Sequence, residues 1–183
     1  MSVPPLGMAA VSGRDVAALH DPRPACIVGA CGADGAVGFA TIIWATPVSH
    51  DPAMTAIALR ARSHTMGLLR ESGRFSLCTL PATADAVQLV ELCGSSTGHK
   101  ADKGALVPHQ VVDGVPVPLM ALSWQLCAME SVQETGDHLL VVGTVESAGT
   151  ALEQRDERGR LLPWEGLLCV QHGAYGACQP LEG

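Results

Sequence analysis

Aromatic side chains are scarce in this chain of 183 residues, of which phenylalanine, tyrosine and tryptophan together make up only 3%. The hydrophobic content is nevertheless 48%, which excludes a disordered chain. The core must therefore be built mainly from aliphatic and small side chains. A chain of this length fits one domain with a sizeable core. We expect an N-terminal arm at residues 1–20 and a single domain at residues 21–183.

Signals for several other protein classes are missing. The formal net charge is −7 and no run of lysine or arginine is longer than a pair, so we expect no nucleic-acid partner. No apolar run approaches the roughly 18 residues that a membrane span needs. The first residues also lack the basic and apolar segments of a signal peptide. These absences predict a cytoplasmic protein without a membrane partner.

The seven cysteines include no Cys-x-x-Cys pair. Zinc ligands usually come in such closely spaced pairs, so we expect no metal site. Most of the cysteines lie in apolar runs, and their number is odd, which is typical of buried free thiols in a reducing compartment. A cysteine hydrolase built on Cys93 and His138 is the weakest functional alternative, because no activating motif surrounds Cys93.

Short runs of β-branched and alternating apolar residues predict a mainly β chain. Glycine, proline and Asp-Gly signals bound these runs, which cover residues 25–31, 37–48, 54–59, 74–80, 121–132, 138–148 and 167–171. Helices are expected at three places, two of them after a hydroxyl N-cap: residues 13–20, 66–71 (after Ser63) and 83–92 (after Thr83). Residues 104–118 have no clear period and predict an irregular extended connection. Many short strands with few helices favour a barrel or a sandwich.

A polar stretch at residues 92–103 follows the last of these helices and contains two glycines, three hydroxyl side chains, a histidine and two lysines. Its N–H groups, hydroxyls and positive charges suit a phosphate, although glycine and serine also end helices in plain polar turns. A basic segment at residues 60–65 precedes the helix expected at 66–71. It offers either a second anion site or a solvated loop.

The order of several short motifs along the chain resembles the flavin reductase family with the FMN-binding split-barrel fold. These motifs are Trp44 with Pro47-Val48-Ser49 and Asp51-Pro52, then His64-Thr65, Glu71-Ser72-Gly73-Arg74-Phe75, Cys93-Gly94 with Thr97-Gly98 and Asp102-Lys103, Gly136-Asp137-His138, and Gly173 with Tyr175. The resemblance implies an α+β fold that is mainly β, a split β-barrel with Greek-key-like connections. It also implies a homodimer that binds FMN or FAD, reduces it with NADH or NADPH, and often serves a flavin-dependent oxygenase.

The resemblance also implies which residues bind the flavin. The ring and ribityl chain would lie along six consecutive residues: Thr41, Ile42, Ile43, Trp44, Ala45 and Thr46. The phosphate would lie between two groups, Arg60, Arg62, Ser63, His64 and Thr65 on one side and Gly94, Ser95, Ser96, Thr97, Lys100 and Lys103 on the other. Tyr175 would be a further contact.

His138 and Asp137 are the catalytic candidates, because the resemblance places His138 close to the flavin and the nicotinamide. An imidazole titrates near neutral pH and can donate to the negative charge of a reduced flavin or orient a carboxamide. The flavin itself carries the hydride chemistry, while the protein positions the rings and tunes them. The alternative is a structural role, in which Asp137-His138 is only a polar strand entrance.

Three departures from the family pattern remove donors from the expected flavin pocket. Many members have serine at the position of Ile43 and arginine at the positions of Ser63 and Ala174. A lost charge-assisted phosphate contact typically costs a few kcal/mol, which is enough to turn tight retention of flavin into exchange. Besides a flavin reductase, the sequence therefore leaves open a flavin-binding electron carrier and a split barrel that binds another small molecule or catalyses non-redox chemistry.

Overall fold

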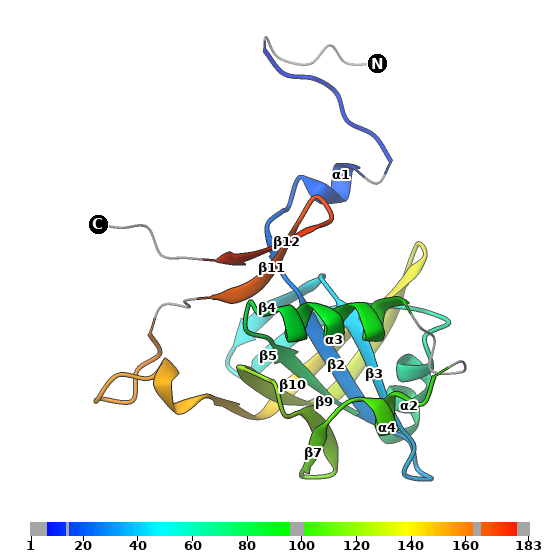
Figure 1. Cartoon of the computed structure of the whole chain (residues 1–183). Coiled ribbons are helices and arrows are strands. Elements are labelled where there is room, and N and C mark those ends of the chain that lie inside the picture. The colour runs from blue at the N-terminus through cyan, green and yellow to red at the C-terminus, as the bar shows by residue number, and fades with distance from the viewer. Residues whose placement is uncertain (1–6, 14, 96–100, 163–165, 179–183) are drawn as a thin grey trace.

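A computed structural model of the protein describes residues 7–13, 15–95, 101–162 and 166–178. Its main sheet has seven antiparallel strands in the order β3-β2-β6-β9-β10-β5-β4. These strands are β2 (Cys26–Cys31), β3 (Val37–Ile42), β4 (Ala45–His50), β5 (Ala53–Arg60), β6 (Arg74–Thr79), β9 (Ser123–Thr135) and β10 (His138–Thr150). The sheet curls into an open barrel (Figure 1), in which β3 and β5 approach one another. The predicted mainly β structure is confirmed.

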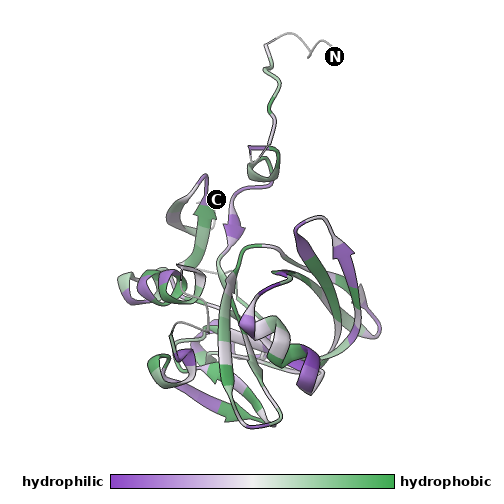
Figure 2. Cartoon of the chain, turned by 90° about the vertical axis from the view of Figure 1, so that its right-hand side faces the viewer, coloured by the Kyte–Doolittle hydropathy of each residue, from purple (hydrophilic) through white to green (hydrophobic). Residues whose placement is uncertain are grey.

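Aliphatic side chains fill the interior of this curled sheet around a single phenylalanine, Phe75. Gly143 of β10 faces that ring, and a Cβ atom there would come within 2.8 Å of it, so only glycine fits this position. A second core lies between the sheet and the helix that covers it, and it contains Phe39, Leu80 and Leu89. Figure 2 shows apolar residues running through the strands. The expected aliphatic core is therefore confirmed.

Helix α2 (His64–Ser72) connects β5 to β6 and packs against β2 and β3. It ends where predicted, at Gly73, which has a φ of 69° and donates its N–H to the Leu69 carbonyl. Glycine suits this position because other residues rarely adopt a left-handed conformation. Ser63 occupies the predicted N-cap position, but its side chain makes no cap hydrogen bond.

Helix α3 (Ala84–Ser95) lies across the sheet in Figure 1. It begins after Thr83, whose hydroxyl accepts a backbone N–H from the first turn at 3.3 Å. The prediction that this helix ends at residue 92 is wrong by three residues. The helix continues because Cys93 is buried in the second core and the Ser95 hydroxyl donates to the Glu91 carbonyl.

The predicted strand at residues 37–48 is two strands, interrupted at Ile43 and Trp44. The single-strand prediction is wrong because the pairing changes there: β3 pairs with β2, whereas β4 pairs with β5 at the opposite end of the sheet. Ile43 and Trp44 therefore carry the chain from one edge of the sheet to the other. Trp44 is partly exposed at this crossing.

Residues 104–118 are also more regular than predicted. They contain α4 (Lys103–Leu106) and a hairpin of β7 (His109–Val112) and β8 (Val115–Pro118). Asp113 and Gly114 form the turn with φ values of 48° and 82°. Two positive φ values match the two-residue turn that favours Asp-Gly. Asp113-Gly114 is therefore a hairpin signal, although the prolines in this region led to the prediction of an irregular connection.

A second, three-stranded sheet joins the two ends of the chain. It contains β1 (Arg23–Pro24), β11 (Leu167–Gln171) and β12 (Ala174–Cys178), of which the sequence predicted only β11. Cys169 and Cys178 form a disulfide between β11 and β12, with their Cα atoms 6.4 Å apart. This differs from the expected free thiols, because neighbouring antiparallel strands bring the two side chains together.

Cys31 is the thiol expected to react first with an alkylating reagent, because the other four free cysteines are buried. Burial raises the pKa of Cys26, Cys78 and Cys127 to about 12 and that of Cys93 to about 11. Since the thiolate is the reactive form, iodoacetamide at neutral pH should label Cys31 alone in the native protein. Peptide mass spectrometry locates the label, and native labelling of Cys93 at the rate of Cys31 would contradict this expectation.

The N-terminal arm projects from the body and contains one short helix, α1 (Asp15–Ala18) (Figures 1 and 2). Its base is fixed by Asp21, whose carboxylate accepts hydrogen bonds from Arg23 Nε and from the His172 N–H, each at 2.7 Å. The arm is therefore tied to the turn between β11 and β12. Among the described helices, none has the length and apolar character required to cross a membrane.

Candidate functional site

Three predicted site segments meet where the β3–β4 crossing reaches the β5–β10 pair, and we call this cluster the Trp44 corner: Trp44, Arg60, Asp137 and His138. Trp44 comes from the crossing between β3 and β4, Arg60 ends β5, and His138 begins β10. The β5–β10 register pairs His138 directly with Arg60. The indole of Trp44 and the imidazole of His138 contact each other, with ring centroids 4.7 Å apart. Residues far apart in the sequence thus form one aromatic and polar cluster.

Asp137 fixes the orientation of the His138 ring. The distance between His138 Nδ1 and Asp137 Oδ1 is 2.8 Å, and the imidazole is only 16% exposed. The hydrogen bond from His138 lowers the pKa of the Asp137 carboxyl group, and the charges of His138 and Arg60 add to this effect. Since a carboxylate can only accept, Nδ1 is the protonated nitrogen of this bond, and Nε2 is left to contact a ligand.

An apolar cavity of about 580 Å³ opens beside Trp44. Its floor is the outer face of β4, β5 and β10 together with the crossing, and its residues are Ile43, Trp44, Ala45, Thr46, Ala56, Ile57, Ala58 and Leu140. The other wall comes from Gly13, Val16, Ala17 and His20 of the arm and from Arg23 of β1. The small alanine side chains leave a broad apolar surface that suits a flat aromatic ring.

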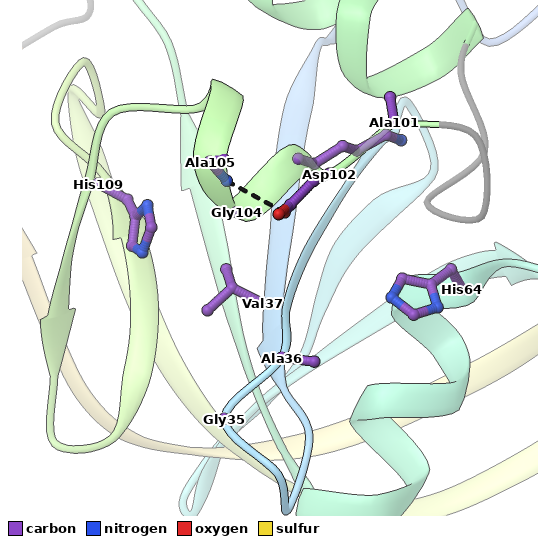
Figure 3. A pocket seen from close by; sticks show the side chains of 10 residues that line it. Gly35, Ala36, Val37, His64, Ala101, Asp102, Gly104, Ala105 and His109 are labelled. Atoms are coloured by element: carbon purple, nitrogen blue, oxygen red, sulfur yellow. Dashed lines mark hydrogen bonds between the residues drawn. The ribbon is translucent and has the colours of Figure 1, made fainter.

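A second, more polar cavity of about 630 Å³ lies between the first turn of α2, the α4 segment and the β2–β3 turn (Figure 3). His64 of α2 and His109 of β7 stand on opposite sides of it in that view. Its other lining residues are Gly35, Ala36, Val37, Ala101, Asp102, Lys103, Gly104 and Ala105. This polar cavity combines charged, imidazole and very small side chains.

Lys103, which lines the polar cavity, is only 5% exposed. Its ammonium group donates to the Phe39 carbonyl at 3.0 Å and to the Cys93 carbonyl at 2.7 Å, which ties α4 to β3 and to the end of α3. No carboxylate of the described residues forms an ion pair with it. Burial lowers the pKa of Lys103, because it disfavours the charged ammonium. An ammonium has three N–H donors, and these two hydrogen bonds use two of them.

The first turn of α2 offers further donors for an anion. Ser63 at its N-cap makes no side-chain hydrogen bond, so no side chain at this position caps the first N–H groups of the helix. The helix lies close to β3, because a Cβ atom on Gly38 would come within 2.7 Å of Leu68 and 3.2 Å of Thr65. An apolar cavity for a ring, and a buried cation and helix N-terminus for a phosphate, fit the chemistry of a flavin nucleotide.

Comparison with known proteins agrees with this chemistry. A family model described as a flavin reductase like domain matches residues 19–177. The chain belongs to the flavin reductase-like family. It is 27% identical over 146 residues to a flavin reductase of Pseudomonas putida, an alignment that covers 79% of this chain and 81% of that protein. The family assignment makes the chain an oxidoreductase.

Solved structures share the fold of this chain even where their sequence identity to it is low. An FMN-binding protein from Thermus thermophilus with bound 1-cyclohex-2-enone superposes with a TM-score of 0.81 at 28% identity, over 96% of each chain. A flavoredoxin from Methanosarcina acetivorans gives a TM-score of 0.77 at 21% identity, over 88% of each chain. The predicted split-barrel fold is confirmed.

Several residues predicted from the flavin reductase resemblance line the two cavities. Ile43, Trp44, Ala45 and Thr46 line the apolar cavity, and His64 and Lys103 line the polar one. Arg60 belongs to the Trp44 corner. Arg62 is exposed in the loop before α2, and Ser63 stands at the start of that helix.

Other predicted residues have structural contacts instead. The Thr41 hydroxyl donates to the Val90 carbonyl of α3 at 2.6 Å, and Ile42 is buried in the barrel interior. Gly94 packs close to Thr41, and Thr65 is buried against β3. Two further predicted residues are not among those that line the two cavities. Tyr175 lies on β12, and the Ser95 hydroxyl donates to the Glu91 carbonyl. Ser96, Thr97 and Lys100 lie outside the described residues.

Two groups of site residues were missed by reasoning from the sequence. One is the arm segment with Val16 and His20, whose weak local signals do not indicate a contact with β5 and β10. The other is the pair Asp102 and His109 in the polar cavity. Asp102 was named only as part of a motif, although its position as N-cap of α4 follows from the Asp-x-x-Ala spacing.

Proposed function

We propose that the protein is an NAD(P)H-dependent flavin reductase that acts as a homodimer and supplies reduced flavin to a flavin-dependent oxygenase. The observation that carries the proposal is the Asp137–His138 hydrogen bond beside Trp44, at the edge of an apolar cavity. The relative in Pseudomonas putida is a flavin reductase, and the similar Thermus thermophilus protein binds FMN. A flavin reductase of styrene monooxygenase shares the fold, which motivates the proposed acceptor.

The residues that would hold the flavin follow from the two cavities. The apolar floor with Trp44, Ala58 and Leu140 would take the ring, and the first turn of α2 with Lys103 would take the phosphate. When bound, the flavin supplies the redox chemistry by accepting a hydride from the nicotinamide. Trp44 and residues of the arm also line this cavity.

His138 would act on the charge that develops during hydride transfer. Its Nε2 atom would hold or donate a proton, while Nδ1 stays bound to Asp137. The carboxylate would keep one tautomer of the imidazole in place. Arg60, opposite His138 on β5, adds positive charge to the same corner. These groups bind and orient the reactants, and only His138 exchanges a proton in this scheme.

Anaerobic stopped-flow mixing tests the proposed function. The purified protein is incubated with FMN or FAD and mixed with NADH or NADPH, and loss of the visible flavin absorbance is followed. We expect reduction with at least one nicotinamide at a rate far above that of free flavin. A protein that binds flavin without reducing it would be an electron carrier. If the protein binds neither FMN nor FAD, the proposal is wrong.

Replacing Ser63 by arginine is expected to tighten FMN binding by about tenfold, because it returns a charge-assisted phosphate contact at the N-terminus of α2. The substitution sacrifices no cap hydrogen bond. Glu71→Arg places the same side chain at an exposed position at the other end of α2 and should leave the affinity unchanged. Titration of FMN fluorescence measures both variants. Equal affinities for Ser63→Arg and the wild type would place the phosphate elsewhere.

A further inference from the structure

The outer edge of β12 is open. In its three-stranded sheet β12 is the last strand, so it pairs with β11 on one side only. Leu168 of β11 accepts a backbone hydrogen bond from the β1 side, and Cys169, the next residue, therefore faces β12. Cys169 pairs with Gly176, so the main-chain N–H and C=O groups of Tyr175 and Ala177 point outward. Among the described residues, no backbone group bonds to them from that side.

This edge lacks the features by which proteins usually prevent unwanted strand pairing, namely charged side chains, proline and β-bulges. At an edge of the main sheet, β4 contains Pro47 and a register shift between Pro47 and Ser49. β12 has the sequence Ala-Tyr-Gly-Ala-Cys, without charge or proline, and its register with β11 runs without a shift. The disulfide between Cys169 and Cys178 fastens it to β11. β12 is therefore an ordered template on which another strand can pair.

The N-terminal arm contains a segment that suits this template. Residues 8–12, Met-Ala-Ala-Val-Ser, form neither helix nor strand and are all exposed. Met8 is 69% and Val11 45% exposed, and no charged side chain occurs among the first 13 residues. Burial of apolar surface is favourable, and an extended peptide can add to an open sheet edge through its main-chain hydrogen bonds. The arm therefore offers the free main chain and the apolar surface that such an edge can bind.

The course of the arm favours β12 of a second copy over β12 of the same chain. Asp21 accepts the His172 N–H at the β11–β12 turn, which fixes the base of the arm. Beyond this anchor, residues 7–13 lead away from α1 and from the hairpin in both views (Figures 1 and 2). Fully extended, a segment of this length spans at most about 25 Å, which is enough to reach a neighbouring molecule. Because the arm and β12 start at the same turn, one two-fold contact can place each arm against the other β12.

We propose that residues 8–12 add a strand to the outer edge of β12 in a second copy of the chain, and that two copies exchange these segments reciprocally. This exchange is the contact surface of the homodimer in the proposed function, on which the inference rests, and it needs no bound flavin. The main-chain groups of Tyr175 and Ala177 in each copy bond to the arm of the other. Met8 and Val11 lose part of their exposure to water on pairing.

Ala177→Pro tests the edge, with Ala177→Ser as the matched control. Proline removes the outward N–H and places its ring on the edge, whereas the pairing with β11 does not use this N–H. Serine keeps the N–H at the same exposed position. Sedimentation equilibrium without flavin measures the dissociation constant of the dimer. Ala177→Pro should raise it at least about tenfold, because both symmetric contacts lose a hydrogen bond. Ala177→Ser should change it less than about twofold.

Val11→Asp tests the arm in the same measurement. A carboxylate in the exchanged segment would be partly buried without a partner, so the dissociation constant should again rise at least about tenfold. Leu161→Asp introduces the same charge at another exposed apolar residue outside the arm and should leave the dimer unchanged. Thermal melting of each variant verifies the fold.

Cross-linking identifies which arm occupies the edge. Cys31→Ser first removes the one free thiol that is not buried. Ala10→Cys and Ala174→Cys are then introduced into separate copies, which are mixed and treated with a bismaleimide. The reagent should join the two kinds of copy into a covalent dimer, and mass spectrometry should find the linked peptides around residues 10 and 174. A chain that carries both changes should give the same link between copies.

Three outcomes would overturn the inference. A dimer that forms equally well in Ala177→Pro and Val11→Asp would have its contact elsewhere. A link that forms only within chains carrying both cysteines would assign the edge to the arm of the same molecule. A wild type that stays monomeric at micromolar concentration would contradict both the exchange and the proposed homodimer. Flavin reduction in stopped-flow mixing would be unaffected by these three results, so the proposed reductase activity is tested separately.

Discussion

Replacing His138 by alanine is expected to slow flavin reduction by about a hundredfold while changing flavin affinity less than about threefold. The imidazole is held by Asp137 and packs against Trp44, so it is prepared to act without rearrangement. Its Nε2 is the atom left for the reactants, and proton donation matters mainly in the transition state. Single-turnover stopped-flow kinetics and flavin titration measure the two effects separately.

Asp137→Asn supplies the accompanying pH test. The pKa of Asp137 lies below its usual value of about 4, so its carboxylate stays charged at neutral and mildly acidic pH. Its hydrogen bond to His138 is therefore present in that range and is lost only as the pH falls through the lowered pKa. The wild type should reduce flavin faster than Asp137→Asn at neutral and mildly acidic pH, and the two rates should converge only as the pH falls through this lowered pKa.

His50→Ala, a change at an exposed residue of β4, serves as the control for both variants. It should leave rates and affinities at wild-type values. If His138→Ala weakens flavin binding as much as it slows reduction, the ring has a positional and not a chemical role. If the rates of Asp137→Asn and the wild type agree at neutral pH, the carboxylate does not orient the imidazole.

Elements bounded by local signals could be predicted from the sequence. Gly73 ends α2 where expected, and β11 coincides with residues 167–171. The break at Ile43 and Trp44 could not be predicted, because it falls within Thr41-Ile42-Ile43-Trp44, a run of strand-forming side chains. Only the change of pairing partner from β2 to β5 interrupts it. Strand pairing joins distant segments, and no local propensity encodes it.

Some features of the candidate site could also be predicted from the sequence, whereas others could not. The family resemblance predicts that Trp44, Asp137 and His138 belong to one site, and the β5–β10 register explains how they meet. The identities of these three side chains do not by themselves indicate that the residues lie close together. The burial of Lys103 could not be predicted either, since its partners are backbone carbonyls, which every residue possesses. Residue identity indicates the chemistry available, while the fold decides which groups are free to use it.

Replacing Lys103 by methionine is expected to weaken flavin binding by about thirtyfold and to lower the free energy of unfolding by about 1–2 kcal/mol. Methionine has a similar length but cannot donate, so the buried carbonyls of Phe39 and Cys93 lose their partner. Removing a buried charge offsets part of this loss, because burial already disfavours the ammonium and lowers its pKa. The loss of two donors exceeds that relief.

Thermal unfolding with and without flavin separates the two effects of Lys103→Met. Flavin should raise the Tm of the wild type clearly and that of the variant only slightly, since the shift follows affinity. Arg70→Met removes an exposed charge from α2 and should behave as the wild type in both measurements. A variant at Lys103 that is destabilised but keeps its flavin-dependent shift would show that the lysine only ties α4 to β3. The phosphate would then depend on the first turn of α2 alone.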